Sequence, residues 1–578
     1  MKRLLLIALL ILVIIVTGLC ARKVITSSGD EVERAGQTAS PAPGNGTPVI
    51  EPQPSLEPTP QSVDGGAAPA EATPAEESVF RLLVPDPGMP AGTKAPLWYS
   101  NDVPIEDVPL WYLDSVYESL LYIPGEDQLD IRGCLAESWY SSEDSLVWTF
   151  KIRQNARFSD GTVCDAAAVK AAWDRAAQNG MFDGDGMAWE AVDSGTFAVR
   201  LSEPVANFEQ ITACYGGYTN RNAIPISSDS GLGTGPFAVE SFDSGKGMVL
   251  TKNTYYDFEP KAPLVDRVEI VFYESGLNMT ALDLLEKEGV GAGVFCAPAP
   301  DSAGKEYTGE FMEKAEKMQE KGYSVLCSYP RSMQVCFGDG TELLSRQDFR
   351  KALSLLVDNS QIDRELYRGW GREQRSIFSE WNPAYAEFEG FGYDPEEANV
   401  LLAEMGVDLG ELELSQRVTS DVSAYFLEMA RQLEEAGLNI ETEVLGPQYS
   451  FSPLFDGGWA LYPMSNAEAA TNPWNGFAIY FLTWEERFAD RWKFLLGQDG
   501  YSELEQLYTS SRDPGLSYEE QVSLLRQLTT QVQEEYLALP GVQKPDVCIV
   551  SDSVEELELY TGRHFRAPEV KLYSVIMK

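Results

Sequence analysis

The stretch CLAESWYSSEDSLVWTFKIRQNARFSDGTVCDAAAVKAAWDRA, residues 134–176, decides the fold. Within it Ser145–Arg153 alternates between apolar and polar residues, and a period of two predicts a half-buried strand. Its apolar face is formed by Leu146, Trp148, Phe150 and Ile152.

A turn and a helix are predicted directly after this strand. Ser159-Asp160-Gly161 has turn chemistry, because glycine accepts a positive φ that other residues resist. Asp165 suits the N-cap of an alanine-rich helix. The helix places Val169, Trp173 and Ala176 on one side, as a buried face requires. Periodicity alone indicates an α/β domain and nothing more specific.

The sequence of residues 134–176 resembles the signature of the family 5 extracellular solute-binding proteins. These proteins are the oligopeptide, dipeptide and nickel receptors of ABC importers. That signature is Leu-Ala-Glu-Ser-Trp, a strand, Phe-x-Asp-Gly-Thr, and a helix with a valine and an aromatic residue. Two later stretches also resemble the family: GTGPF at 233–237 and FRKALSLLVDNSQIDRELYRG at 349–369. The resemblance implies a two-lobed α/β fold of the periplasmic-binding-protein type. It also implies an extra subdomain in lobe 1 and a hinge formed by chain crossovers.

Composition limits the functions that this chain can have. At 578 residues the chain is too long for one core. Its 44 Lys and Arg against 89 Asp and Glu give a net charge of −45, which excludes nucleic acid as an expected partner. The single histidine, His564, cannot build a multi-histidine zinc site. No GxSxG, P-loop or HExxH pattern stands out. We therefore expect no enzyme, no catalytic residue, no metal and no cofactor.

The cysteines do not form a recognisable framework. Eight are scattered along the chain without a CxxC pair, at positions 20, 134, 164, 214, 296, 327, 336 and 548. If Cys20 is used elsewhere, seven remain, so not all of them can pair within one chain. Most are expected to be small buried hydrophobes, and one bridge remains conceivable.

The N-terminus has the pattern of an export signal. A basic start at Met1-Lys2-Arg3 precedes the apolar run Leu4–Val16, a length that suits a signal peptide. Residues 16–20, VTGLC, resemble a bacterial lipobox, which implies lipidation of Cys20. Leu19 departs from the small residue that the family prefers there, so an uncleaved anchor and ordinary secretion remain alternatives. The predicted location is the extracytoplasmic face of the cell membrane, lipid-anchored, at a cell surface or in a periplasm.

Five segments are predicted along the chain. Residues 1–20 form a lipoprotein-type signal peptide, and 21–78, rich in Pro, Ala and Glu, form a disordered tether. The resemblance then implies lobe 1 at 79–330 with a subdomain at about 112–190, lobe 2 at 331–540, and a return to lobe 1 at 541–578.

Individual elements are predicted from periodicity and turn residues. Strands are expected at Val79–Val84, Thr196–Leu201, Phe237–Phe242, Met248–Lys252, Val265–Tyr273, Ser332–Phe337, Leu412–Thr419 and Leu438–Leu445. Helices are expected at Pro109–Leu121, Thr280–Glu288, Arg346–Tyr367, Gly392–Val407, Val422–Ala436 and Ser517–Leu539. The run from Leu412 to Leu445 predicts a βαβ-like unit with mostly parallel strands.

The candidate ligand-binding segment is Phe455–Pro463, FDGGWALYP. Many relatives read Gly-Trp-x-Ala-Asp-Tyr here, and peptide binders use that Asp to hold the peptide ammonium group. This chain lacks the Asp; Glu468 and Asp456 are the alternatives that lie nearby. The resemblance, together with amide and aromatic side chains along the following loop, points to a pocket. The residues predicted to line it are Trp459, Tyr462, Asn466 and Trp474, with Trp98 and Tyr99 from an earlier loop, and Asn472 and Asn475 also lie in the loop. A core or surface-cap role is the alternative for each.

The function that the resemblance implies is a receptor that delivers a small solute, with a peptide as the leading candidate, to an ABC transporter. Solute would bind between open lobes and favour their closure. The expected partners are the solute, a transporter permease and, through the lipid anchor, the membrane; the receptor is expected to be a monomer. Two alternatives remain: a sensor of the same fold that signals without transport, and a surface scaffold that binds a non-peptide ligand.

Overall fold

The computed structural model describes residues 77–86, 110–124, 130–178, 186–205, 208–213, 223–274, 277–287, 289–295, 309–329, 331–419, 423–445, 458–467, 473–474, 477, 486–560 and 569–578. The signal segment, residues 21–76 of the predicted tether, Trp98, Tyr99 and His564 therefore lie outside the described residues, whereas Ser78, at the predicted end of the tether, donates to the Asp266 carboxylate at 3.0 Å.

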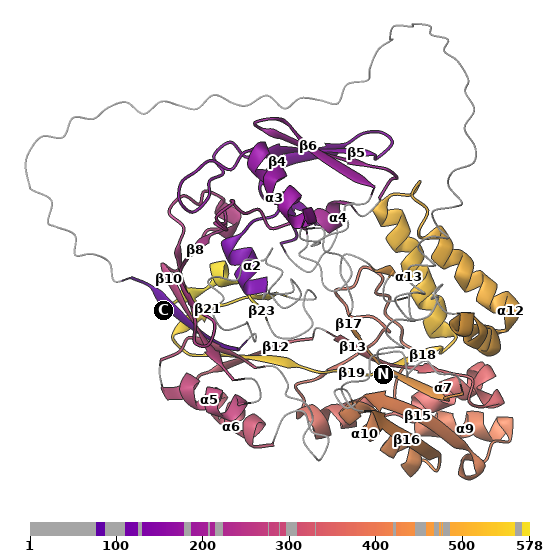
Figure 1. Cartoon of the computed structure of the whole chain (residues 1–578). Coiled ribbons are helices and arrows are strands. Elements are labelled where there is room, and N and C mark those ends of the chain that lie inside the picture. Colours follow the sequence, from indigo (N-terminus) through magenta and orange to yellow (C-terminus); the bar gives the residue numbers. More distant parts are fainter. Residues whose placement is uncertain are drawn as a thin grey trace, which may run out of the picture. The chain divides into compact units, whose positions relative to one another are not determined.

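A seven-stranded mixed sheet organises lobe 1 (Figure 1). Its strand order is β12-β20-β11-β1-β10-β9-β8. The strands are β1 (Val79–Pro85), β8 (Phe237–Asp243), β9 (Gly247–Lys252), β10 (Arg267–Tyr273), β11 (Ala292–Phe295), β12 (Ser324–Ser328) and β20 (Asp546–Val550). Only β1 pairs in parallel, with β10 and β11, and the other pairs are antiparallel.

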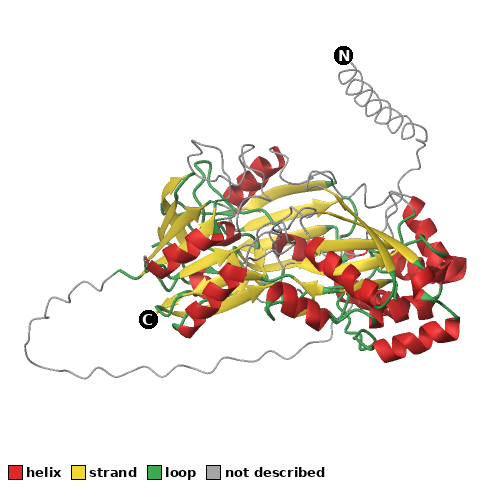
Figure 2. Ribbon diagram, turned by 90° about the horizontal axis from the view of Figure 1, so that it is seen from below, coloured by secondary structure: helices red, strands yellow, loops and turns green. Residues whose placement is uncertain are grey.

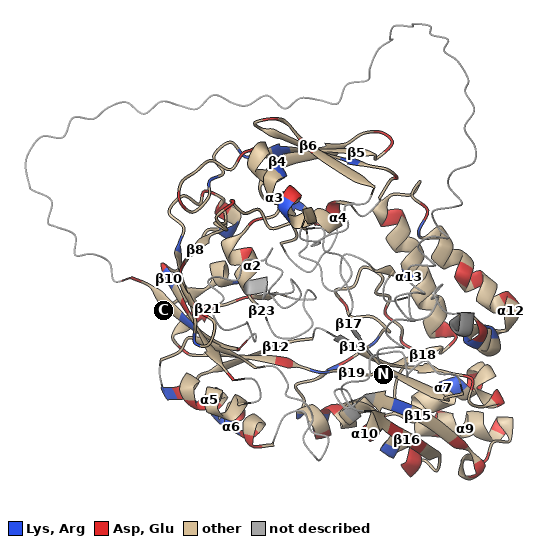
Figure 3. Cartoon of the chain, viewed as in Figure 1, with Lys and Arg blue, Asp and Glu red and all other residues tan. Residues whose placement is uncertain are grey.

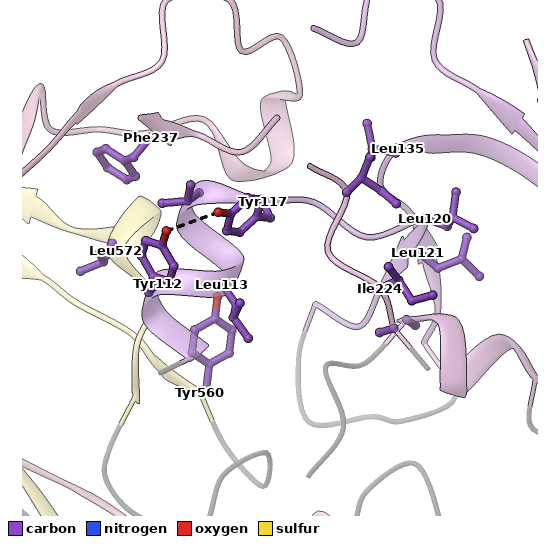
Figure 4. Close-up of a cluster of buried hydrophobic side chains, with 14 of the residues drawn as sticks. Tyr112, Leu113, Tyr117, Leu120, Leu121, Leu135, Ile224, Phe237, Tyr560 and Leu572 are labelled. Carbon is purple, nitrogen blue, oxygen red and sulfur yellow. Dashed lines mark hydrogen bonds between the residues drawn. The ribbon is translucent and has the colours of Figure 1, made fainter. Parts of the chain in front are cut away.

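Both faces of this sheet are covered. Alternate residues of β1 separate the two cores: Leu83 packs with helices α5 (Asn278–Lys287) and α6 (Gly309–Glu320), and Leu82 packs on the opposite side. The opposite core contains α2 (Leu110–Val116) together with C-terminal residues such as Tyr560 and Leu572 (Figure 4). Because successive residues of β1 point to opposite faces, this strand contributes to both cores. The core on the Leu82 side contains residues from both ends of the described chain.

Residues 134–176 fold as predicted from the sequence. Strand β5 (Val147–Ile152) buries Trp148, Phe150 and Ile152 in alternation. Gly161 has φ of 87°, and the Asp165 carboxylate accepts the backbone N–H of Ala168 at 3.0 Å, at the start of α3 (Ala166–Gln178). The strand belongs to a four-stranded sheet of order β4-β5-β7-β6. Its other strands are β4 (Ala136–Ser141), β6 (Met187–Asp193) and β7 (Thr196–Leu201).

A buried ion pair ties this subdomain sheet to α2. Arg153, directly after β5, donates to both carboxylate oxygens of Glu118 at 2.9 and 3.0 Å and to the Cys134 carbonyl at 2.8 Å. Burial raises the pKa of Glu118, although the charge of Arg153 acts in the opposite direction. A second buried pair, Lys261 with Asp114 at 2.5 Å, holds α2 from another side.

Glycines in the predicted GTGPF motif are required for close packing. A Cβ on Gly233 would lie 1.8 Å from the carbonyl oxygen of Val116, and one on Gly235 would lie 2.6 Å from the Val116 carbonyl carbon. The motif therefore lets the backbone approach the end of α2, and neither glycine adopts a positive φ.

A five-stranded mixed sheet of order β16-β15-β17-β13-β18 organises lobe 2. Its strands are β13 (Arg331–Phe337), β15 (Glu413–Thr419), β16 (Asn439–Leu445), β17 (Leu461–Ala467) and β18 (Ala538–Pro540). The predicted βαβ unit is confirmed: β15 and β16 are parallel and are joined by α10 (Ser423–Glu435). β13, however, is antiparallel to both of its neighbours.

Helices flank the strands of the molecule, as Figure 2 shows. Those of lobe 2 are α7 (Gln347–Leu355), α8 (Asn359–Ile362), α9 (Pro395–Met405), α10, α12 (Glu486–Ser510) and α13 (Tyr518–Glu534). In α12 the helix is interrupted at Gly497, which has φ of 73°. Figure 3 marks the acidic residues in red on the ribbons of α9 and α12, in keeping with the acidic composition.

Three predicted helices are too long. The helix expected at Pro109–Leu121 ends at Val116, and Leu121–Tyr122 forms strand β2. The helix expected at Arg346–Tyr367 is divided after Leu355, because Asp358 caps a new helix by accepting the Gln361 N–H at 2.9 Å.

The third helix that was predicted too long, Ser517–Leu539, ends at Glu534. Arg350 explains this end. Its side chain is fully buried in α7, and its guanidinium donates to the carbonyls of Glu535 at 2.6 and 3.0 Å and of Leu344 at 2.8 Å. A cation is favourable where a helix exposes its last carbonyl groups. Burial lowers the pKa of Arg350 to about 10, so it stays charged at neutral pH.

The described cysteines are free: Cys134, Cys164, Cys336 and Cys548 are buried, and Cys327 is half-buried. This agrees with the expectation that most of the cysteines are small buried hydrophobes, with Cys327 the less buried one of these five. Burial raises the pKa of Cys327 to about 11, so its thiol is almost entirely protonated at neutral pH. Cys20, Cys214 and Cys296 lie outside the described residues.

Replacing Arg350 with Met is expected to lower the free energy of unfolding by about 3 kcal/mol, because several buried carbonyls lose their donor. Lys351→Met is the control, since Lys351 makes a partly exposed pair with Glu397 at 2.7 Å and should cost less than about 1 kcal/mol. Denaturant unfolding of the two variants measures the difference. Equal losses would contradict the role given to Arg350.

Candidate ligand-binding site

Strand β17 carries the last three residues of the predicted binding segment, Leu461–Pro463, through the middle of the lobe 2 sheet. Phe337 lies opposite Leu461 at one end of the β13–β17 ladder, and Arg331 lies opposite Ala467 at the other. The segment was predicted as a loop, and this is wrong for residues 461–467. Pro463 is tolerated because β15 pairs with β17 only at Leu461, so no ladder on that side needs the missing N–H.

The two lobes are joined at one end of this sheet. β12 of lobe 1 runs into β13 through residues 329–330, and β18 continues through β19 (Val542–Gln543) into β20. Both crossovers therefore leave the lobe 2 sheet where β13 begins and β18 ends. The β17 residues at this end are Asn466 and Ala467, opposite Ser332 and Arg331.

Side-chain contacts hold the crossovers together. Gln543 donates to the Ser379 hydroxyl at 2.8 Å, and the Tyr329 hydroxyl donates to the Trp370 carbonyl at 3.0 Å. Arg372 lies over the Tyr329 ring at 4.4 Å. These contacts fix the connecting strands against lobe 2 side chains.

One further ion pair links the lobes directly. Arg368, at the end of the helical region after α8, donates to both carboxylate oxygens of Glu316 in α6 at 2.8 and 2.7 Å. This bidentate geometry is the favourable one for Arg with a carboxylate.

Trp459 lies at the opposite end of β17, away from the crossovers. It is half-buried against the lobe 2 core, and the Arg417 guanidinium lies 4.4 Å from its ring centre. The neighbouring turn fits closely, since a Cβ on Gly338 would lie 2.1 Å from the Trp459 carbonyl oxygen. Asp339 in the same turn accepts the Gly458 N–H at 3.1 Å.

Tyr462 is buried and only 3% exposed. The Arg491 guanidinium, from α12, lies 3.9 Å from its ring centre, which is a cation–π arrangement. Burial lowers the pKa of Arg491. Both rings thus face a guanidinium, although Arg417 is paired with Glu443 at 2.8 Å and the Asp339 carboxylate lies in the turn beside Trp459.

Trp474 packs between helices. Its indole N–H donates to the hydroxyl of buried Ser511 at 3.0 Å, and its ring lies 6.2 Å from that of Tyr518 in α13. The structure therefore brings Trp459, Tyr462 and Trp474 into lobe 2, with Asn466 at the crossover end. Glu468, Asp456, Asn472, Asn475, Trp98 and Tyr99 lie outside the described residues, and the binding roles of all these residues stay predictions.

Sequence reasoning missed two features of this site: the cations over Trp459 and Tyr462, and the position of the segment as a central strand. Arg417 and Arg491 are distant from the segment in sequence, so no local pattern indicated them. The apolar run WALYPM could have indicated a strand, although Pro463 and Asn466 favoured a loop.

Comparisons with known proteins agree with this architecture. Residues 130–488 match the family model described as bacterial extracellular solute-binding proteins, family 5 Middle. This is more than half of the chain, so the chain belongs to that family.

Three similar proteins illustrate the range of the family. "Probable D,D-dipeptide-binding periplasmic protein DdpA" from Escherichia coli (strain K12) is 31% identical over 141 residues, covering 22% of this chain and 27% of DdpA. "Glutathione-binding protein GsiB" from the same strain is 24% identical over 318 residues, covering 51% of this chain and 57% of GsiB. The matches thus span less than two thirds of either relative.

The crystal structure of NikA from Brucella suis in complex with Fe(III)-EDTA superposes on this fold with a TM-score of 0.66. The two chains are 18% identical, and the match covers 86% of this chain and 100% of NikA. At this identity the likeness shows the shared two-lobed fold. Among the residues that the structure describes, no helix is long and apolar enough to cross a membrane, and no group of three or more His, Cys, Asp or Glu side chains is placed to hold a metal ion.

Substitutions at the two rings should separate packing from solute contact. Tyr462→Ala is expected to lower the free energy of unfolding by about 3 to 5 kcal/mol, because a buried ring leaves a cavity. Trp459→Ala should cost about 1 to 2 kcal/mol, because the ring is only partly buried. Denaturant unfolding without solute tests both. A negligible cost for Tyr462→Ala would mean that its ring is available to a ligand.

Proposed function

We propose that this chain is an extracytoplasmic receptor that binds short peptides and delivers them to an ABC transporter permease by closure of its lobes. The observation that carries the proposal is the membership of the solute-binding family together with two crossovers at one end of the lobe 2 sheet. DdpA is named for dipeptides and GsiB for glutathione, which is itself a peptide. NikA with Fe(III)-EDTA is the contrary example, so the solute has to be tested.

The crossover end of β17 is the proposed place of peptide contact. Solute that favours closure must touch both lobes, and the lobes are joined beside Asn466 and Ala467. Glu468 follows Ala467 directly in the sequence. We propose that Glu468 supplies the carboxylate for the peptide ammonium, in place of the Asp that the segment lacks. At the other end of the strand, guanidinium groups already lie over the rings of Trp459 and Tyr462.

Thermal melting of the purified 578-residue chain, cleared of bound solute, tests this proposal. A mixture of short peptides with free amino termini should stabilise the chain, by about 2.7 kcal/mol at 100 times the dissociation constant. The same mixture N-acetylated should stabilise it less, because the ammonium is lost. Glu468→Gln should remove the difference between the mixtures, since a charge-assisted hydrogen bond contributes about 1.5 to 3 kcal/mol.

Glu404→Gln, on the exposed side of α9, is the matched control and should behave as the wild type. An unchanged melting temperature with either peptide mixture would remove peptides as the solute. A stabilisation that survives in Glu468→Gln with the same preference for free amino termini would move the ammonium site elsewhere. Loss of peptide uptake on deletion of the gene would separate transport from signalling, and survival of uptake would favour a sensor.

We also propose that Cys20 anchors the receptor through a lipid. Metabolic labelling with palmitate should mark the wild-type chain and not Cys20→Ser, because the thiol is the acceptor. Cys327→Ser, the half-buried thiol of β12, should be labelled as the wild type. An unlabelled wild-type chain in the membrane fraction would indicate an uncleaved anchor instead, and one in the medium would indicate ordinary secretion.

A further inference from the structure

Lobe 2 contains a cavity of about 280 Å³ that the proposed solute site does not use. It lies among α7, α8, α10, β18, the short strand β14 (Arg372–Glu373) and the loop that precedes α9. Its lining is Ser354, Val357, Asn359, Glu373, Gln374, Arg375, Phe388, Glu389, Phe391, Gly392, Tyr425, Met429, Leu539 and Pro540. The volume suits a ligand smaller than a typical drug molecule.

The aromatic wall of this cavity is preformed. Phe388 and Phe391 meet edge to face with ring centres 4.8 Å apart. The Tyr536 ring contacts both, at 5.7 and 5.8 Å, and its hydroxyl donates to the Gly390 carbonyl at 3.1 Å. The loop that carries the two phenylalanines is thus held by α13's end, and an entering ligand meets an ordered apolar surface.

The neutral polar groups of the lining are already satisfied by the protein. Asn359 donates to the Pro540 carbonyl at 3.1 Å and accepts the Tyr425 hydroxyl at 2.8 Å. The Gln374 side chain accepts the Met333 N–H at 2.6 Å. These groups therefore shape the cavity, and the charged side chains decide what it attracts.

The lining carries two exposed carboxylates, Glu373 and Glu389, against one guanidinium, Arg375. Arg375 is the lining cation, and it is paired with Glu387 at 3.2 Å. Within the described part of the chain, the Glu373 side chain accepts one hydrogen bond, from the neutral Ser360 hydroxyl at 3.3 Å. Neither Glu373 nor Glu389 forms an ion pair with any residue in the described ranges. A cation is the ligand charge that such a site favours.

We propose that this cavity is a second ligand site, which binds a small primary amine with an aromatic body. The ammonium group lies between the carboxylates of Glu373 and Glu389, and the body lies against Phe388, Phe391 and Met429. The inference goes beyond the proposed function and does not depend on which solute binds at the crossover end of β17.

The occupant would touch strands that lead into a crossover. Glu373 in β14 pairs with Val542 in β19, and Leu539 and Pro540 in the lining belong to β18. Arg372, beside Glu373, pairs with Gln543 of the crossover. The amine site is therefore continuous with the segment that connects the lobes.

Calorimetric titration of the full chain with 2-phenylethylammonium chloride tests the inference, and 2-phenylethanol is the neutral analogue. The ammonium should bind about tenfold more tightly than the alcohol, because only the ammonium meets the carboxylates. The double variant Glu373→Gln, Glu389→Gln should weaken ammonium binding by about tenfold or more. The control double variant Glu404→Gln, Glu411→Gln removes the same charge from exposed positions outside the lining and should bind as the wild type.

Three results would overturn the proposal: no heat of binding at millimolar ammonium, equal affinity for the alcohol, or unchanged affinity in the Glu373 and Glu389 double variant. Glu468→Gln separates this site from the proposed peptide site. The amine should bind to Glu468→Gln as tightly as to the wild type. If Glu468→Gln lost amine binding while the Glu373 and Glu389 double variant kept it, the amine would bind in the peptide site.

Discussion

The buried guanidinium of Arg350 is the interaction on which the rest of lobe 2 depends. It binds the carbonyls at the end of α13, where the chain stops being helical and turns into β18. Because β18 pairs with β13 and then leads into the crossover, the position of this helix end fixes where the chain leaves lobe 2. The Tyr536 ring, one residue beyond Glu535, also supports the aromatic wall of the cavity. A single buried cation thus positions both a hinge strand and a candidate ligand site.

Much of the fold could be predicted from the sequence because local patterns and the family resemblance agree. The strand with Trp148 and Phe150, the turn at Gly161 and the Asp165 cap all follow from short-range rules. The errors arise where distant residues decide the outcome. The end of α13 depends on Arg350 from α7, and β17 is a strand because β13 pairs with it along its length. The residues that neighbour these segments in the sequence do not contain that information.

The candidate site was harder to predict than the fold for a related reason. A pattern identified the segment, yet its orientation relative to the crossovers follows only from sheet order. That order makes Asn466, and with it Glu468 two residues further along the chain, better candidates for solute contact than Trp459. The charge next to the two rings is also set by residues distant in sequence. Although the chain carries a net charge of −45, the groups over Trp459 and Tyr462 are arginines. Net charge describes the surface as a whole and does not determine the charge at one site.

The place of β20 in the first sheet has a consequence for biosynthesis. β20 lies between β11 and β12, and 217 residues separate the end of β12 at 328 from the start of β20 at 546. At typical synthesis rates the ribosome takes roughly 10 to 40 seconds to make that interval. During this time the facing edges of β11 and β12 have no partner, and unpaired strand edges invite aggregation. The nascent chain therefore has to be kept apart from other chains, by a chaperone or a translocation channel, until β20 has been made.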